Sequence, residues 1–144
     1  MPTATFLDTN ILIYAATGKQ SEPGKWAISH DLLAEPDATI SAQVLAEFYS
    51  NVVRKRYLSL RDAGIWLDRL SLMPMVNVDA ALVIEGAAIS QRYQISYWDG
   101  AIVAACNRCE ASVLYTEDLN GDQLYGAVRA INPFSGLVRA GEAP

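Results

Sequence analysis

The sequence predicts an α/β protein in which helices cover both faces of a mainly parallel β-sheet. Short apolar runs with strand character alternate along the chain with segments of helical periodicity, as happens when parallel strands are joined by helices. No internal repeat, low-complexity tract or linker interrupts this alternation. In such a sheet, functional sites form at the carboxyl ends of the strands.

The chain is expected to begin with a strand at Ala4 to Leu7 and a helix at Ile11 to Ala16. Between them, Asp8-Thr9-Asn10 supplies oxygens that accept the unpaired N–H groups of a first helical turn, so helix capping alone would explain this triplet. A loop rich in turn residues, Thr17 to Gly24, then precedes a helix around Lys25 to Leu33.

A second strand–helix unit begins with the strand Ala38 to Ser41. In the helix that follows, apolar side chains recur at i, i+1, i+4, i+5, i+8 and i+9 and form one stripe, which ends near Arg54-Lys55-Arg56. The stripe consists of Val44, Leu45, Phe48, Tyr49, Val52 and Val53. Ser59, with Asp62 three positions later, resembles a capping arrangement and starts another helix to about Leu72, so the two helices form a hairpin.

The second half continues the alternation. A strand at Met75 to Val78 leads to Asp79, which is expected to cap a helix to about Tyr93, and Trp98-Asp99 opens a helix through Arg108. The remaining elements are a strand at Val113 to Tyr115, a turn at Asn120-Gly121, an edge strand at Ala127 to Ile131 and a stop at Asn132-Pro133.

The length of 144 residues and the 51% hydrophobic content suit one domain with a substantial core. We expect this domain at residues 1–135, followed by a tail at 136–144. Met1 to Leu7 has neither a basic segment nor a long apolar stretch, so neither a secretory signal nor a membrane anchor is expected. A cytoplasmic protein is predicted.

Four carboxylates each lie where an apolar run meets a turn or a helix, namely Asp8, Glu47, Asp99 and Asp118. Oxygen ligands from distant segments suit Mg²⁺ or Mn²⁺, because these hard cations prefer carboxylate and water oxygens. Taken singly, each acid could be a solvated side chain or a helix cap, and Glu47 lies only at the edge of its apolar stripe. Together they predict one acidic pocket and a metal-dependent hydrolase.

The net charge of -5 argues against binding nucleic acid through a broad basic face, although divalent ions in a carboxylate pocket could still hold a phosphate. A serine-hydrolase triad is poorly supported, because His30 is the only histidine and no G-x-S-x-G occurs. No glycine-rich phosphate loop is present, and a glycosidase would not require four such carboxylates. Cys106 and Cys109 form a C-x-x-C, but zinc would need two further ligands, so reduced helix residues are expected.

Four motifs give the chain a family resemblance: F-L-D-T-N at Phe6 to Asn10, A-E-F at Ala46 to Phe48, Y-W-D-G-A-I-V-A-A at Tyr97 to Ala105, and L-Y-T-E-D-L at Leu114 to Leu119. In this order the motifs resemble those of PIN-domain ribonucleases. With the ending Ile131-Asn132-Pro133-Phe134, the chain resembles the VapC-type toxins of bacterial toxin–antitoxin pairs. The resemblance covers nearly the whole chain and implies a three-layer α/β/α sandwich with a mainly parallel central sheet.

The resemblance also implies an Mg²⁺- or Mn²⁺-dependent endoribonuclease whose acidic quartet is the four carboxylates named above. Asp8 and Asp99 would be the principal metal ligands, and Asp118 would be the second-ion or outer ligand. Glu47 would bind through water or orient the nucleophile. These individual roles follow from the resemblance and from the chemistry of metal-assisted phosphodiester hydrolysis.

Neighbouring residues would support the quartet. Thr9 and Asn10 match the first motif and would orient the acidic site through hydrogen bonds, while Thr116 would support Asp118 or a metal-bound water. Glu117 and Asp122 place two more carboxylates near Asp118 and are reserve candidates for the fourth ligand.

The basic residues Arg54, Lys55, Arg56 and Arg61 could contact RNA phosphates, or could simply complement the dipole at a helix C-terminus. The aromatic residues Tyr49, Tyr57, Trp66, Tyr97 and Trp98 could stack bases, although their helical settings favour core or dimer packing. The expected partners are RNA, a cognate antitoxin and a second copy in a homodimer. A non-catalytic interaction module is the alternative, which the intact acids disfavour.

Overall fold

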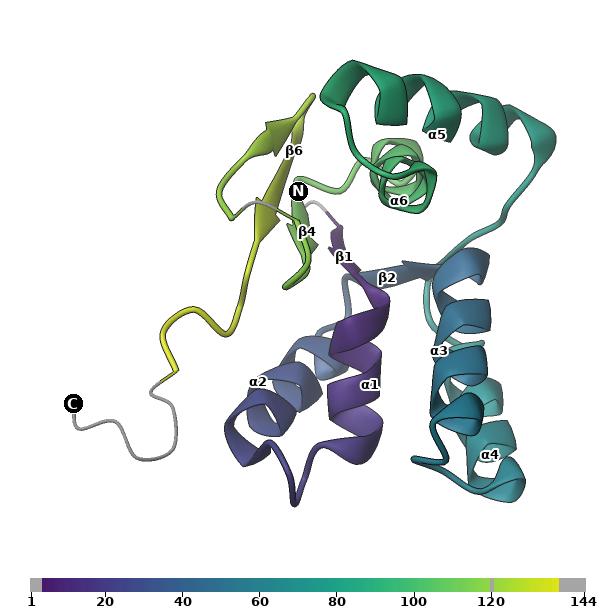
Figure 1. The fold of residues 1–144 in the computed structure, drawn as a ribbon, viewed down its shortest axis with the longest axis vertical. Helices are drawn as coiled ribbons and strands as arrows, with labels where there is room; N and C mark the ends of the chain where they lie inside the picture. Colours follow the sequence, from purple (N-terminus) through teal and green to yellow (C-terminus); the bar gives the residue numbers. More distant parts are fainter. Residues whose placement is uncertain (1–3, 120, 138–144) are drawn as a thin grey trace.

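The computed structural model describes residues 4–119 and 121–137 and shows strands between two groups of helices (Figure 1). Within these residues, six strands form one sheet in the order β3-β2-β1-β4-β6-β5. All neighbours are parallel except β5 and β6, which are antiparallel. The strands are β1 (Thr5–Leu7), β2 (Ala38–Ser41), β3 (Met75–Val76), β4 (Val113–Tyr115), β5 (Leu124–Tyr125) and β6 (Val128–Ile131).

The helices are α1 (Thr9–Thr17), α2 (Pro23–Ala34), α3 (Ala42–Arg54), α4 (Leu60–Leu70), α5 (Ala80–Tyr93) and α6 (Tyr97–Arg108). Helices α5 and α6 lie on one side of the strands and α1 to α4 on the other (Figure 1). The predicted fold class, a mainly parallel sheet between two helical layers, is therefore confirmed.

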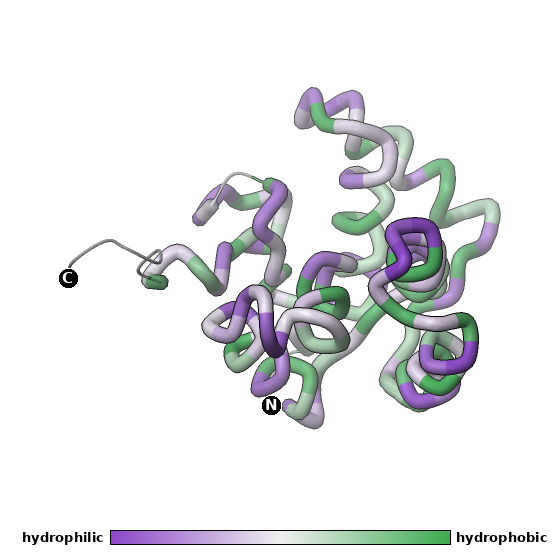
Figure 2. The backbone as a smooth tube through the Cα atoms, turned by 60° about the horizontal axis from the view of Figure 1, so that its bottom comes forward, coloured by the Kyte–Doolittle hydropathy of each residue, from purple (hydrophilic) through white to green (hydrophobic). Residues whose placement is uncertain are grey.

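The hydrophobic core lies where the central strands meet the helices. Phe6, Leu7, Ile40 and Leu114 of these strands are fully buried. The apolar stripe of α3 also faces inward, and its Phe48 is fully buried. Hydrophobic and hydrophilic residues alternate along the covering helices, as expected for helices with one face on a core (Figure 2).

Side-chain caps mark where α4, α5 and α6 begin. The hydroxyl of Ser59 accepts a hydrogen bond from the N–H of Asp62, and Asp79 caps α5, as the sequence predicted. Helix α6 begins at Tyr97, one residue before the predicted start. Ser96 caps it by accepting from the N–H of Asp99, a serine–acid spacing that the prediction overlooked.

The largest correction concerns the end of the sheet. The strand predicted at its edge, now β6, lies between β4 and β5, and the edge strand β5 was not predicted. Tyr125 pairs with Val128, so only two residues separate the strands, and Gly126 there has a φ of +65°. A two-residue strand before such a tight turn has too few residues to show an alternating pattern.

Smaller differences lie at element ends. Strand β3 ends at Val76 instead of Val78, and α2 begins at Pro23, whose fixed φ suits a first helical turn. Asn120 of the predicted turn and residues 138–144 of the predicted tail lie outside the described residues. No helix in the described part of the chain combines the length and apolar character needed to cross a bilayer.

Candidate active site

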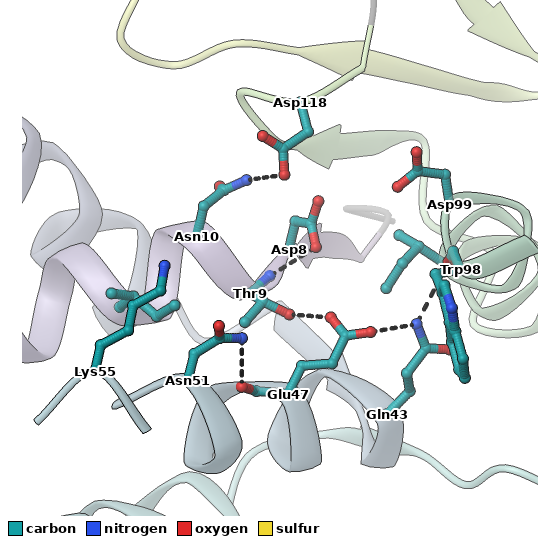
Figure 3. A pocket seen from close by; sticks show the side chains of 12 residues that line it. Asp8, Thr9, Asn10, Gln43, Glu47, Asn51, Lys55, Trp98, Asp99 and Asp118 are labelled. Carbon is teal, nitrogen blue, oxygen red and sulfur yellow. Dashed lines mark hydrogen bonds between the residues drawn. The ribbon is translucent and has the colours of Figure 1, made fainter. Parts of the chain in front are cut away.

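The four predicted carboxylates lie around one cavity of about 260 Å³ (Figure 3). Asp8 follows β1 and begins α1, while Asp118 lies in the loop that follows β4. Strands β1 and β4 are parallel neighbours, so their carboxyl ends bring these two acids to the same edge of the sheet. Glu47 reaches the cavity from α3, and Asp99 from the first turn of α6.

Asp8 is buried at the base of this cavity, with only 6% of its surface exposed. One carboxylate oxygen accepts a 2.7 Å hydrogen bond from the N–H of Thr9, and the other accepts a 2.7 Å bond from the hydroxyl of Thr116. The pKa of Asp8 is raised to about 6, mainly by burial, while the hydrogen bonds from Thr116 and Thr9 lower it and the negative charges of Asp118 and Glu47 raise it. Asp8 is therefore a carboxylate that lacks a compensating cation.

Glu47 is held by hydrogen bonds to both of its carboxylate oxygens. The hydroxyl of Thr9 donates to one oxygen at 2.8 Å, and the side-chain amide of Gln43 donates to the other at 2.9 Å. Thr9 thus contacts Asp8 through its backbone and Glu47 through its side chain. These contacts fix the relative positions of two acids that are 39 residues apart in the sequence.

Asp118 and Asp99 complete the ring of acids. The amide of Asn10 donates a 3.1 Å hydrogen bond to Asp118, and the backbone N–H of Asp118 donates to the Thr116 hydroxyl. Burial raises the pKa of Asp99, the hydrogen bond at Ser96 lowers it, and the charges of Asp118 and Glu47 raise it. Thr116 therefore connects Asp8 to Asp118 through hydrogen bonds. Asp99 lies close enough to Asp118 and Glu47 for their negative charges to act on it.

A polar ridge runs along α3 beside the acids. Its residues recur every four positions and all line the cavity: Gln43, Glu47, Asn51 and Lys55, at the C-terminal cap of the helix. Residues four apart lie one above the other on a helix, so one face of α3 presents all of them. Lys55 is the one cationic side chain among the described residues that line the cavity.

The donor set of the cavity suits a divalent cation, because its carboxylates are the hard oxygen ligands that Mg²⁺ and Mn²⁺ prefer. Their hydrogen-bond partners are neutral threonine, asparagine and glutamine groups, which leave the negative charge uncompensated. In the described part of the chain, however, no three acidic, histidine or cysteine side chains are grouped closely enough to hold an ion. The chemistry fits a metal, and the side chains would have to draw together around it.

The sequence matches the model of the PIN domain family over residues 5–126, which is most of the chain. The chain belongs to the PIN domain family. A search of curated protein sequences finds no match.

Several solved structures share the fold of this PIN domain. The VapC20 toxin of Mycobacterium tuberculosis, which cleaves the sarcin–ricin loop, superposes with a TM-score of 0.66 at 20% identity over 88% of this chain and 99% of that chain. A toxin–antitoxin complex from Klebsiella pneumoniae gives 0.67 at 21% identity over 91% and 98%. FitAcB from Neisseria gonorrhoeae gives 0.58 at 19% identity over 91% and 99%.

The reserve acids of this PIN domain do not line the cavity. Glu117 accepts a 2.6 Å hydrogen bond from the hydroxyl of Tyr14 and forms a 3.1 Å ion pair with Lys25, so its charge is compensated elsewhere. Asp122 is exposed and adopts a left-handed backbone conformation. The fourth position around the cavity therefore belongs to Asp118, which the prediction ranked ahead of both.

Of the four basic residues that could contact RNA, only Lys55 lines the cavity, whereas Arg54, Arg56 and Arg61 do not. The prediction missed Asn51 and did not assign Gln43 to the site. It also favoured core or dimer packing for Trp98. This residue is 62% exposed at the cavity wall and is therefore not a core residue, while dimer packing stays a prediction. The spacing of four between Gln43 and Glu47, continued twice, places these residues on one side of the helix, but the same spacing is found on solvated helix faces.

Proposed function

We propose that this PIN domain is a metal-dependent endoribonuclease that acts as the toxin of a type II toxin–antitoxin pair. The observation that carries the proposal is the meeting of four carboxylates, drawn from α3, α6 and the ends of two neighbouring strands, at one cavity. Membership of the PIN domain family supports it, and so does the structural similarity to VapC toxins.

Asp8, Asp99 and Asp118 would hold Mg²⁺ or Mn²⁺, with Glu47 as the fourth acid of the site. When bound, such an ion lowers the pKa of water and stabilises negative charge on phosphoryl oxygens. Glu47 accepts hydrogen bonds from Thr9 and Gln43, and it would orient the attacking water or bind the ion through water. Water adds to the phosphorus atom while one phosphorus–oxygen bond of the RNA backbone breaks.

Hydrogen bonds from the supporting residues hold the acids at the cavity. Thr116 donates to Asp8 and accepts from the backbone of Asp118, while Asn10 donates to the Asp118 side chain. Lys55 lies at the far end of the ridge and would bind a phosphate of the RNA. This role suits an otherwise acidic chain, because one well-placed cation is enough to position a phosphate locally.

The expected partners follow from the proposal. The similar structure from Klebsiella pneumoniae is a toxin–antitoxin complex, which supports a cognate antitoxin for this chain. We further propose a homodimer and a cytoplasmic location. The alternative is a non-catalytic interaction module, and the absence of a close three-ligand group among the described residues is the observation in its favour.

The decisive experiment incubates the purified protein with total cellular RNA and Mn²⁺, Mg²⁺ or EDTA and maps the cut ends. We expect cuts at defined positions with either metal and none with EDTA. Asp99→Asn should abolish cleavage, whereas Asp122→Asn, which changes an acid outside the cavity, should retain it. Cleavage by Asp99→Asn equal to wild type would refute the assigned site, and no cleavage by any protein would favour the interaction module.

A further inference from the structure

We propose that an apolar groove beside the acidic cavity binds a base of single-stranded RNA, with Trp98 as its stacking surface. The inference rests on the proposed function and assigns a substrate-binding site to a surface outside the acidic quartet. By stacking on one base, Trp98 would determine which phosphodiester bond of the RNA lies at the acidic cavity.

The groove has a volume of about 800 Å³, which is larger than the acidic cavity. Its walls come from α3, from the start of α6 and from the segment around the start of α5. They consist of Ala42, Gln43, Ala46, Glu47, Ser50, Val78, Val83, Tyr97 and Trp98. Three of these residues, Gln43, Glu47 and Trp98, also line the acidic cavity, so the two sites share a wall.

Trp98 is exposed and yet held in place. Its ring packs edge-on against Tyr97, with centroids 5.0 Å apart and planes at 75°. Its carbonyl oxygen accepts a 3.3 Å hydrogen bond from the amide of Gln43, the same amide that donates to Glu47. The backbone of Trp98 is therefore linked to the acidic site through the Gln43 side chain, the ring is held by Tyr97, and Asp99 is the next residue in the sequence.

The shared wall favours RNA as the occupant. An RNA strand with a phosphate in the acidic cavity has its next base within reach of the groove, and every base offers a flat face to an aromatic ring. Trp98 and Lys55 lie at opposite sides of the cavity (Figure 3). One end of the α3 ridge thus offers a surface for a base and the other offers a cation for a phosphate.

The requirement for a single strand follows from the same geometry. Bases in a duplex are stacked on one another, so a protein ring reaches a base face only where the strand is unpaired. A protein partner seated in the groove would instead cover the wall that Gln43 and Glu47 share with the acidic cavity. It would thereby restrict the entry of substrate, which would suit an antitoxin but not the active enzyme, in which this wall is free for RNA.

The test uses a short single-stranded RNA that spans a mapped cut, with one abasic position introduced at a time. For the wild type in Mn²⁺, we expect KM to rise roughly ten-fold at one position beside the cut, since stacking of one base accounts for a change of that order. With the intact RNA, Trp98→Ala should already show the KM that the wild type shows with the abasic RNA. Removing the base at that position should raise the KM of the variant no further. Trp98→Phe should restore part of the difference, with kcat little changed throughout.

Tyr49→Ala is the matched control, because Tyr49 is a partly exposed aromatic residue on α3 that lines neither site. It should retain the wild-type pattern. An unchanged abasic profile in Trp98→Ala would overturn the inference while leaving the ribonuclease proposal standing. The inference would also be overturned if Trp98→Ala changed from dimer to monomer in light scattering while no single abasic position raised the KM of the wild type. The groove would then be a protein interface. No cleavage by the wild type would refute both.

Discussion

At the scale of single residues, Asp8 shows a conflict between stability and function. A carboxylate buried to this extent normally has a cation beside it, yet the contacts of Asp8 are a backbone N–H and a threonine hydroxyl. The surrounding acids raise its pKa instead of lowering it. Such an arrangement costs folding free energy, which is expected where a site is built to receive positive charge.

Asp8→Asn should therefore stabilise the metal-free protein at neutral pH. With a folded pKa of about 6 against an ordinary value of 3.8, the contribution of Asp8 to stability is complete below pH 3.8 and is lost as pH rises through 6. Above both values the loss corresponds to about 3 kcal/mol, of which the variant should recover a part because asparagine can still cap α1.

Urea denaturation in EDTA between pH 4 and 8 measures this effect. The free energy of unfolding of the wild type should fall relative to that of the variant as pH rises. The same variant should cleave no RNA, even though it is the more stable protein. A variant less stable than the wild type at pH 8 would show that the negative form of Asp8 is stabilised by contacts other than those described.

At the scale of elements, the sequence pattern of α3 predicts the role of its apolar side but not that of its polar side. Its apolar stripe could be predicted because packing on a core requires that spacing, and Phe48 and Val52 are indeed buried. The side of α3 that adjoins this stripe is polar whether it meets bulk water or an active site. The pattern alone therefore cannot distinguish Asn51 in the cavity wall from an ordinary solvated side chain.

The ridge leads to a prediction for Lys55. Lys55→Met should weaken binding of single-stranded RNA to an inactive Asp99→Asn background, because it removes the cation at the cavity. The slope of log affinity against log salt should fall in magnitude by about 0.7, as expected for the loss of one phosphate contact. Arg61→Met serves as the control, since Arg61 is exposed on α4 and lies outside the cavity lining. Equal losses in both variants would indicate diffuse electrostatic binding.

The packing of α5 on α6 gives a second prediction for elements. A Cβ atom on Gly100 would lie 2.5 Å from the carbonyl oxygen of Gly86 and 2.9 Å from Ser90, so Gly100→Ala must push the helices apart. We expect a loss of at least about 2 kcal/mol in stability. Because Gly100 directly follows Asp99, metal-dependent cleavage should fall as well.

Gly64→Ala in α4 provides the opposite control. No atom lies within 4 Å of the position that its Cβ would occupy, so the substitution should raise stability by about 0.5 to 1 kcal/mol. Thermal unfolding of the two variants compares them directly. Similar stabilities would mean that α5 and α6 can separate at no cost, contrary to the close contact between their backbones.

The same contrast between local and long-range information explains how much of the site the sequence could reveal. Asp8, Glu47, Asp99 and Asp118 could be proposed because motif and position after predicted elements are local properties. Their connections could not, since the bonds from Thr9 to Glu47 and from Asn10 to Asp118 depend on how strands far apart in the chain pair. Strand β5 was missed for a different reason, since its two residues are too few to show a pattern, and β6 was therefore taken for the edge strand.

At the scale of the whole molecule, a net charge of -5 and a ring of acids make the metal-free state self-repulsive near the cavity. Binding of a divalent cation to the folded state alone should then raise the melting temperature. At an ion concentration of 100 times the Kd, the gain is about 2.7 kcal/mol, which for a chain of this size corresponds to roughly 5 to 10 °C.

Thermal melts at pH 7.5 in EDTA, in MgCl₂ or MnCl₂, and in NaCl of equal ionic strength separate specific binding from general screening. The wild type should gain stability with the divalent salts beyond any gain with NaCl. Asp99→Asn should gain much less, because a proposed ligand is missing, whereas Asp122→Asn should respond like the wild type. The gain should shrink below pH 6, where protons compete for Asp8 and relieve the same repulsion. Identical responses of all three proteins would mean that the acids around the cavity do not bind the ion, whatever cleavage is observed.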